Sequence, residues 1–434
     1  MMCGAIMLLS FSLRNFTSYQ DFEYIDFRPS SIKKLKEGAF HTITNPNDEN
    51  KKEYIYSTNA IFGANASGKS NLIFALRMLV RLIESSATWT EGKKIPVYHP
   101  YKLAHESAEA PIYFELEFIV ENLKYNYIIE FDRNNIVQES LDFYPNGLKA
   151  NLFRRSKDSD WKNISFGKFY SGGIKQIPFF ANQSYLSVAG RSAGTPQIIK
   201  DVYDFITNHI YCISTHVPTS YNKISESYNK FPALQEIASK FIPNIGISAD
   251  KLIAKTIKSE DPEKDDKYEI FIQRKNDQDK LIDFDFYDES DGTRHLIELL
   301  PLITLSFLKN CVLVIDELDS SLHTELAVLL IKIFNDPNLN RKGSQLIFTS
   351  HNLQLMDKEI FDKEQIWFAD KVDKRTKIYS LADFDSKTVT NDSPFRKWYM
   401  HGKFGALPEI NYSNISELIE SISQIVLEYK EETD

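Results

Sequence analysis

Residues 63–70 follow the pattern Gly-x-x-x-x-Gly-Lys-Ser, which is the spacing of a loop that binds a phosphate chain. The two glycines let the backbone approach the phosphates, so that successive N–H groups and the start of the next helix face the anion. Lys69 can reach the β- and γ-phosphates, and the Ser70 hydroxyl can bind Mg²⁺. An apolar pair precedes the loop and a helical pattern follows it, which makes a chance Gly/Ser turn the weaker interpretation. We expect nucleotide contacts from Gly63, Asn65, Gly68, Lys69, Ser70 and Asn71.

Two adjacent carboxylates, Asp316 and Glu317, follow the apolar run 311–315. This pattern predicts a buried strand with both acids at its carboxyl end, the edge where open α/β sheets bind ligands. Asp316 is suited to hold Mg²⁺, directly or through water. Glu317 is suited to orient and deprotonate an attacking water, because phosphoryl transfer depends mainly on positioning and charge stabilisation. A pair of acids that only caps a strand is the alternative, and the phosphate loop upstream makes it the weaker one.

A second strand pattern, 345–349, leads to His351, which could donate a hydrogen bond to the γ-phosphate. Taken alone, a histidine at a strand end is more often structural, and its place after the acidic strand favours the functional role. Ser290 and Gly292 stand at the start of the helical pattern before the acidic pair. They would make a second anion-binding helix start, with Ser290 as the N-cap, although the local sequence alone favours an ordinary cap.

The elements that must position these residues alternate between strand and helix in the last third of the chain. This alternation predicts a parallel sheet with crossover helices. The expected elements are a helix at 293–308, a strand at 311–315, a helix at 322–335 and a strand at 344–349. Upstream we expect a hairpin over 7–28, a polar loop over 30–53 and a strand over 54–62. The tail, 413–429, has the spacing of an amphipathic helix.

Changes in residue pattern divide the chain into four parts. Short strand patterns separated by turn residues run from Pro96 to Phe166, and helical patterns at 198–209 and 231–241 follow. We therefore expect an N-terminal lobe with the phosphate loop (1–95), an inserted antiparallel β subdomain (96–187), a helical insertion (188–265) and a C-terminal lobe (266–434).

Composition limits the function classes. A net charge of -9 argues against a surface that coats nucleic acid, and leaves local contact with DNA open. The 3 cysteines are widely spaced and form neither a metal-binding pattern nor a disulfide framework, which fits a reducing cytoplasm. No stretch approaches about 18 uninterrupted apolar residues, so we expect a cytoplasmic protein without a membrane span.

The order of these motifs resembles that of ABC-type ATPases of the SMC/RecF/OLD lineage. The sequence is more closely similar to the abortive-infection ABC ATPases, a family that includes the ATPase subunit of the PARIS phage-defence system. The resemblance runs through most of the chain and rests on segments 9–19, 289–293, 316–323, 345–351, 362–368 and 399–408 together. It implies an α/β fold: an ABC-type P-loop ATPase head with an inserted antiparallel β subdomain and a helical insertion.

The resemblance also implies an ATP- and Mg²⁺-dependent site that a second subunit completes. Ser290 and Gly292 would form the signature motif, which contacts the γ-phosphate bound by the opposite subunit. Residues 320–323 would form the D-loop at the interface. Gln183 is the candidate for the Q-loop glutamine that binds Mg²⁺, with Asn182 as the alternative. The chain would then form a head-to-tail homodimer, or a higher oligomer, around two ATP molecules.

Two positions depart from the family pattern. The signature reads Ser-Asp-Gly-Thr rather than Ser-Gly-Gly-Gln, and Thr324 stands where the lineage often has proline. Both departures leave ATP binding intact and leave the turnover rate open, so that hydrolysis could be slow.

The resemblance implies a defence ATPase that senses a phage-derived trigger and holds or releases a toxic effector. The segment after His351 is too short for the nuclease domain of OLD-type relatives, and Asp383 with Asp385 is better read as an ordinary pair than as a metal site. The effector would be a partner protein, a Toprim-type nuclease or another toxin. The alternatives are a RecF- or SMC-like DNA-repair ATPase that binds DNA directly and, less favoured, a stand-alone toxin that hydrolyses nucleotides.

Overall fold

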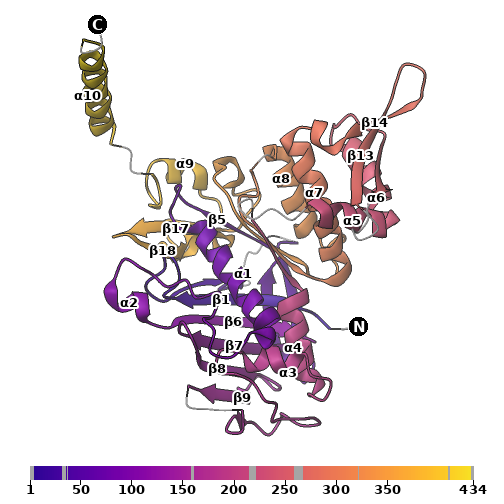
Figure 1. The fold of residues 1–434 in the computed structure, drawn as a ribbon, viewed down its shortest axis with the longest axis vertical. Helices are drawn as coiled ribbons and strands as arrows, with labels where there is room; N and C mark the ends of the chain where they lie inside the picture. The colour runs from indigo at the N-terminus through magenta and orange to yellow at the C-terminus, as the bar shows by residue number, and fades with distance from the viewer. Residues whose placement is uncertain are drawn as a thin grey trace.

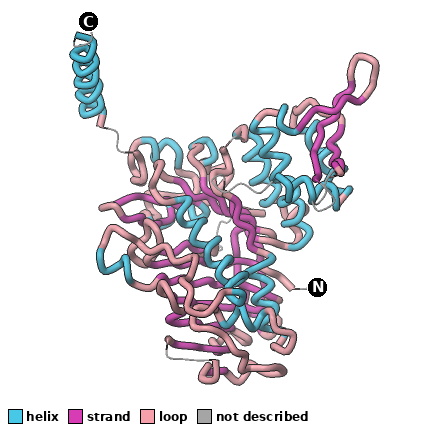
Figure 2. The backbone as a smooth tube through the Cα atoms, in the orientation of Figure 1, coloured by secondary structure: helices cyan, strands magenta, loops and turns pink. Residues whose placement is uncertain are grey.

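The computed structural model describes residues 4–31, 36, 38–157, 161–214, 221–258, 267–320, 322–408 and 411–431 (Figure 1). Two large sheets form the body of the molecule, and a smaller sheet packed with helices lies beside them (Figure 2). Within the described ranges, no helix is long and apolar enough to cross a membrane.

A six-stranded sheet carries most of the candidate residues. Its strand order is β11 (Ile210–Ile213), β15 (Val312–Ile315), β16 (Gln345–Thr349), β5 (Thr58–Phe62), β17 (Ile366–Val372) and β18 (Arg375–Ser380). The first five strands are parallel, and β18 returns antiparallel to β17. Every residue of β5, β15 and β16 is buried, as parallel strands covered on both faces should be. The carboxyl ends of these three neighbouring strands therefore lie together at one edge of the sheet.

Two helices cover this sheet as the alternating pattern predicted. They are α7 (Asp291–Lys309) and α8 (Thr324–Asn335), and each lies within two residues of its expected bounds. Leu299 of α7 and Leu330 of α8 belong to one apolar core with Leu313 and Phe348 of the strands. Because these helix faces are buried against the strands, the carboxyl ends of the strands are held in fixed positions relative to one another.

A seven-stranded antiparallel sheet forms the other half of the body. Its order is β10 (Ser165–Phe166), β9 (Ala150–Ser156), β8 (Ile136–Phe143), β7 (Leu123–Phe131), β6 (Ile112–Val120), β1 (Met7–Arg14) and β2 (Glu23–Asp26). The strands expected as a separate inserted subdomain are antiparallel, but they continue the N-terminal hairpin. The reason is that β1 pairs along its length with β6, with Phe11 opposite Leu116.

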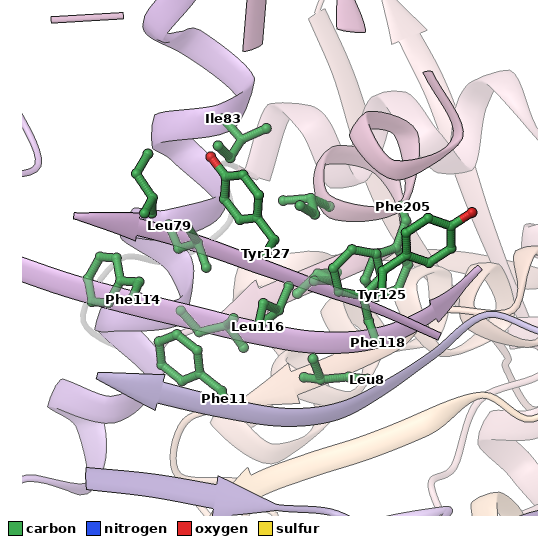
Figure 3. Close-up of a cluster of buried hydrophobic side chains, with 14 of the residues drawn as sticks. Leu8, Phe11, Leu79, Ile83, Phe114, Leu116, Phe118, Tyr125, Tyr127 and Phe205 are labelled. Atoms are coloured by element: carbon green, nitrogen blue, oxygen red, sulfur yellow. The ribbon is translucent and has the colours of Figure 1, made fainter. Parts of the chain in front are cut away.

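Helix α1 (Lys69–Ser85) connects the phosphate loop to this second sheet. Its buried face packs against aromatic and aliphatic side chains of the strands, and α4 (Gln197–Asn208) adds Phe205 to the same core (Figure 3). The side chains in this cluster include Leu79, Ile83, Phe114, Leu116, Phe118 and Tyr127. Because α1 is anchored along its length, its first turn is held rigidly at the candidate site.

The expected helical insertion, 188–265, is not one helical unit. Helix α3 (Tyr185–Gly190) and α4 pack into the first core. Helices α5 (Tyr221–Lys230) and α6 (Pro232–Asn244) instead pack on a three-stranded antiparallel sheet of β12 (Lys251–Ile257), β13 (Lys267–Lys275) and β14 (Leu281–Asp285). The apolar faces of the helices decide this division, since Ile199 and Val202 belong to one core and Ala238 and Ile242 to the other.

The expected polar loop over 30–53 is wrong in its second half. Strands β3 (Phe40–Asn45) and β4 (Asp48–Tyr56) form an antiparallel hairpin there. Much of β4 is exposed and carries charged residues, so its sequence lacks the apolar alternation by which a strand is predicted. Short helices α2 (His105–Glu109) and α9 (Phe395–Met400) complete the body, and the expected tail helix is confirmed as α10 (Tyr412–Glu431).

Candidate functional site

The phosphate loop turns sharply between β5 and α1, and both of its glycines are required for this path. Gly63 and Gly68 have φ angles of 153° and 110°, values that side-chain-bearing residues rarely adopt. A Cβ on Gly63 would lie 2.2 Å from the Ala369 carbonyl oxygen, and one on Gly68 would lie 2.2 Å from the Thr376 hydroxyl oxygen. The loop is thus seated against the β17–β18 hairpin. No side chain caps the start of α1, so its first N–H groups remain available to an anion.

Lys69 is folded back onto its own loop. Its Nζ donates hydrogen bonds to the carbonyl oxygens of Gly63 at 2.8 Å and Ala64 at 2.9 Å, and the residue is 4% exposed. Burial lowers the pKa of Lys69 to about 8, and the nearby Asp316 and Glu317 carboxylates oppose that shift. The hydrogen-bond acceptors of this ammonium are neutral carbonyl oxygens, and a bound polyphosphate would supply negatively charged ones.

Asp316 and Glu317 follow β15 and are held by the neighbouring strand. The Thr349 hydroxyl, at the end of β16, donates to Asp316 Oδ1 at 2.7 Å and accepts from the Glu317 N–H at 2.7 Å. Asp316 is buried, whereas Glu317 is half-buried with a φ of 56°. This left-handed conformation is uncommon for a non-glycine residue and is maintained by the surrounding structure. The two acids therefore take different positions although they are adjacent in sequence.

His351 lies beside Glu317, with Nε2 3.9 Å from Glu317 Oε1. Burial, followed by the positive charge of Lys69, lowers the pKa of His351 from its usual value near 6.5, and Glu317 opposes the shift. The imidazole is therefore neutral at pH 7. A neutral ring can donate one hydrogen bond to a phosphate oxygen while its other nitrogen accepts one.

These side chains surround one cleft of about 600 Å³. The phosphate loop, both catalytic candidates downstream and Lys371 of β17 contribute to its walls. The lining residues are Asn65, Ala66, Ser67, Gly68, Lys69, Ser70, Asn71, Glu317, Asp319, Ser320, His351 and Lys371. The structure thus brings together residues from four separate parts of the sequence at the carboxyl edge of the parallel sheet.

The groups around this cleft fit Mg²⁺ bound together with a nucleotide. Ser70 lines the cleft. Asp316 is buried and does not line the cleft, but it is near enough to Lys69 to oppose the lowering of that residue's pKa, and Thr349 is its hydrogen-bond partner. Among the described residues, no group of three or more His, Cys, Asp and Glu side chains gathers to hold a metal. Mg²⁺ commonly binds through one or two protein oxygens plus phosphate oxygens and water, so Ser70 and Asp316 are a sufficient protein contribution.

The signature candidates lie outside the cleft. Ser290 is exposed at the start of α7, where its hydroxyl accepts a hydrogen bond from the Thr293 N–H at 3.3 Å, as an ordinary N-cap does. Neither Ser290 nor Gly292 is among the residues that line the cleft. Beside them, Glu289 forms an ion pair with Arg274 of β13 at 2.7 Å, which joins the small sheet to the start of α7.

Gln183, expected to bind Mg²⁺, is placed elsewhere by the structure. Its side-chain amide donates to the carbonyl oxygens of Ala87 at 3.1 Å and Trp89 at 3.0 Å, just beyond the end of α1. Asn182 bonds in the same region, to Thr90 and Lys93. Because the 17-residue helix α1 spans about 25 Å, neither side chain can reach a metal at Ser70. The expectation that Gln183, or Asn182 in its place, binds Mg²⁺ is therefore wrong. Both residues instead hold their own part of the chain against the far end of α1.

Three further residues considered in the sequence have local partners. Asn71 donates to the Ser18 hydroxyl at 2.8 Å, which ties the loop after β1 to the start of α1. In the expected D-loop, the Ser320 N–H donates to the Glu317 carbonyl at 2.8 Å, while Ser321 lies outside the described residues. Thr324, one of the two departures from the family pattern, accepts a hydrogen bond from Asn352 at 2.7 Å and so fixes the segment next to His351.

Sequence reasoning missed three residues at this edge. Thr349 could have been found from strand register, because Ile315 pairs with Phe348 and the next residues, Asp316 and Thr349, must then be opposite each other. Ser214 follows the apolar strand β11 and donates to Asp316 Oδ2 at 3.4 Å. Lys371 comes from a hairpin strand whose nearness to the phosphate loop no local pattern indicates.

Comparisons with known proteins agree with this geometry. A family model described as "AAA domain, putative AbiEii toxin, Type IV TA system" matches residues 58–357, which include the phosphate loop, the acidic pair and His351. Together with the sheet topology, this match confirms the expected α/β P-loop ATPase fold with antiparallel sheets. No curated protein matches the chain.

Two solved structures were also found to be similar. An SMC head domain from Thermotoga maritima is 18% identical, with a TM-score of 0.39 over 86% of this chain and 98% of that one. An SMC head bound to the C-winged helix domain of ScpA is 15% identical, with a TM-score of 0.38 over 88% of this chain and 99% of that one.

Proposed function

The chain belongs to the family of AbiEii-type AAA domains, and on that premise we propose that it is a Mg²⁺-dependent ATPase of the ABC type. One observation carries the proposal: Lys69, Glu317 and His351 line a single cleft at the edge of the parallel sheet. A cation for the phosphates, a carboxylate for the water and a neutral donor for the γ-phosphate are the groups that hydrolysis needs.

The chemistry follows from the position of each group. The triphosphate takes the place of the loop carbonyls as the partner of Lys69, and the loop N–H groups surround it. Glu317 accepts a proton from water as the water oxygen attacks the γ-phosphorus. The bond from the γ-phosphorus to the bridging oxygen then breaks, and ADP leaves with that electron pair. His351 donates to a γ-phosphate oxygen, while Mg²⁺, held by Ser70 and Asp316, would neutralise phosphate charge when bound.

We further propose that the site is completed by a second copy of the chain. Ser290 and Gly292 present an exposed helix start that does not reach the cleft of its own chain. In a head-to-tail homodimer, each Ser290 would contact the γ-phosphate held by the other subunit. ATP would then stabilise the closed dimer, because it has more contacts there than on a separate chain.

A phosphate-release assay tests the enzymatic part of this proposal. The purified chain should hydrolyse ATP only with Mg²⁺, and Glu317→Gln should bind ATP and lose hydrolysis. Glu325→Gln, an equivalent change in the first turn of α8, is the matched control and should keep the wild-type rate. Equal rates for Glu317→Gln and the control would exclude Glu317 as the group that activates water.

The biological role we propose is anti-phage defence by abortive infection, in which ATP-dependent assembly senses a phage-derived trigger and holds or releases a toxic effector. The family description, which refers to toxin–antitoxin systems, supports this reading over general metabolism. Cells carrying the chain with its neighbouring genes should show growth arrest upon infection, and Lys69→Ala should abolish it. Arrest that survives this substitution would separate the ATP site from defence.

Two other functions are distinguishable by experiment. A DNA-repair ATPase of the RecF or SMC type would show hydrolysis stimulated by DNA in the isolated protein. A chain that is itself the toxin, as the family description names AbiEii, would arrest growth when expressed alone, without infection or neighbouring genes. Under the defence proposal, neither effect should occur.

A further inference from the structure

Lys371 is a second lysine in the cleft, and the hydrolysis proposed above leaves it without a role. It belongs to β17 (Ile366–Val372), the strand on the other side of β5 from β16 (Figure 1). Its side chain is exposed and lines the cleft together with Lys69. Within the part of the chain that the structure describes, Lys371 forms no ion pair, whereas Arg375 and Lys377 of the same hairpin both pair with Asp21. The charge of Lys371 is therefore available to a ligand.

Strand β17 extends past the end of β5 to the level of the phosphate loop. The two strands are parallel, and Phe368 pairs with Phe62, the last residue of β5. Lys371 lies three positions further along β17, which places its Cα about 10 Å beyond that pair. The backbone of Ala369 is packed against the loop, because a Cβ on Gly63 would lie 2.2 Å from the Ala369 carbonyl oxygen. Lys371 therefore lies at the height of the loop, at the carboxyl edge of the sheet.

Two observations place the Lys371 side chain on the sheet face that α1 covers. Side chains alternate along a strand, so Lys371 shares a face with Ala369, which belongs to the same apolar core as the buried side of α1. In the β17–β18 pairing, Lys371 is opposite Thr376, and side chains that are directly opposite each other lie on one face. The Thr376 hydroxyl donates to the Ser67 carbonyl oxygen of the phosphate loop at 2.8 Å. The Lys371 side chain thus lies on the side of the loop and of the first turn of α1.

The order of the strands decides which part of a nucleotide Lys371 can reach. Glu317 and His351 follow β15 and β16, on one side of β5, and they act at the γ-phosphate in the proposed reaction. Lys371 comes from β17, and two strands, β16 and β5, separate β15 from β17. Adjacent strands are about 4.8 Å apart, so Glu317 and Lys371 approach the cleft from strands about 14 Å apart. A triphosphate whose γ end lies at Glu317 therefore extends toward Lys371 with its nucleoside end.

We propose that Lys371 binds the α-phosphate of the nucleotide, an assignment that rests on the ATPase function proposed for the cleft. The loop and Lys69 then hold the β- and γ-phosphates, while Lys371 holds the phosphate next to the ribose. ATP and ADP share this group, so the contact is the same before and after hydrolysis. An interaction of equal strength in the ground state and the transition state contributes affinity and leaves the barrier of the chemical step unchanged. Lys371 thus determines how tightly the nucleotide is held, and Glu317 how fast it is hydrolysed.

Equilibrium binding of ATP and of ADP to the full chain with Mg²⁺, measured by displacement of a fluorescent nucleotide, tests the assignment. Lys371→Met keeps the apolar part of the side chain and removes the charge. It should weaken both nucleotides by the same factor, roughly 10-fold, because a hydrogen bond to a charged group is lost. Lys371→Arg keeps the charge and should retain most of the affinity. Lys374→Met is the matched control: Lys374 is exposed on the same hairpin, does not line the cleft, and should be replaceable without loss of affinity.

Hydrolysis kinetics give a second readout that a merely structural change would not produce. Lys371→Met should raise the KM for ATP by roughly the same 10-fold, while kcat at saturating ATP changes far less. Glu317→Gln should show the opposite division, with binding retained and kcat lost. A fall in kcat for Lys371→Met at unchanged KM would mean that Lys371 acts on the transition state, which contradicts the assignment.

The binding results also separate this inference from the ATPase function. If the wild-type chain binds neither nucleotide, the ATPase function itself is wrong. If the wild-type chain binds both and Lys371→Met binds them equally well, the assignment of Lys371 is wrong and the ATPase function stands. A loss of ATP affinity with unchanged ADP affinity would place Lys371 at the γ-phosphate. An equal loss in Lys374→Met would indicate a general attraction by the hairpin. Either of these last two results overturns the assignment.

Discussion

Thr349→Val is a substitution that isolates the link between the two strands at the catalytic edge. The Thr349 side chain is fully buried, and its hydroxyl bonds both the Asp316 carboxylate and the Glu317 N–H at 2.7 Å. Valine keeps the shape and the β-branching of threonine, so the strand and its packing should persist. The substitution removes the hydroxyl, and with it the hydrogen bonds to the Asp316 carboxylate and to the Glu317 N–H.

The expected cost follows from these two contacts. A buried hydrogen bond to a charged group is worth about 1.5–3 kcal/mol, and a buried N–H or oxygen left without a partner adds a penalty of similar size. We therefore expect Thr349→Val to destabilise the chain by about 2–4 kcal/mol. A catalytic group displaced by about 1 Å can lose a factor of about 100 in rate, so turnover should fall roughly 10- to 100-fold.

Three measurements together decide the matter. Thermal unfolding gives the stability, phosphate release gives kcat, and fluorescent-nucleotide binding gives the affinity, which should change far less than kcat. Thr349→Ser keeps the hydroxyl and should retain most of the activity. If the valine variant is folded and hydrolyses ATP at the wild-type rate, Thr349 does not position the two acids and the reasoning is refuted.

Three further predictions concern residues outside that pair. Gln183→Ala should lower the free energy of unfolding by about 1–3 kcal/mol, because it leaves the carbonyls near the end of α1 unpaired. The Mg²⁺ concentration needed for hydrolysis should not change. A higher Mg²⁺ concentration would show that Gln183 does contribute to the metal site. Arg274→Ala should slow hydrolysis while leaving ATP affinity intact, because it frees Glu289 beside Ser290; unchanged kcat would contradict this link. Affinity for ATP should fall as the pH rises through about 8, the pKa of Lys69. Above that pH the free chain carries a neutral amine, so binding must take up a proton. Calorimetry that shows constant affinity from pH 7 to about 9.5 would exclude this proton uptake.

The local patterns predicted which residues meet at the carboxyl edge of the sheet, and the reason is physical. The phosphate loop and the strand ends at Asp316 and His351 are encoded by short segments with strong periodicity, and parallel strands bring their carboxyl ends together. Once the sheet forms, their nearness requires no information beyond strand order. The same logic could have found Thr349 from its register with Asp316.

Residues that depend on distant packing could not be predicted in this way. Gln183 follows a plausible motif order, yet the buried Glu139 carboxylate accepts from the Tyr185 and Leu186 N–H groups and holds this segment at the far end of α1. The division of 188–265 between two cores likewise depends on which apolar surface each helix meets. Strand β4 escaped notice because its charged side chains remain in solvent.

The central claim is that each ATP site is shared between two chains, and complementation between two inactive variants tests it most directly. Lys69→Ala removes the phosphate cation, and Ser290→Asp keeps an N-cap while placing a negative charge where the γ-phosphate of the other subunit would lie. Each variant alone should be inactive. Co-expressed, half of the randomly formed dimers are mixed and each has one intact site of two, so about a quarter of the wild-type activity should return. Full activity of Ser290→Asp alone, or no recovery in the mixed protein, would contradict the shared site.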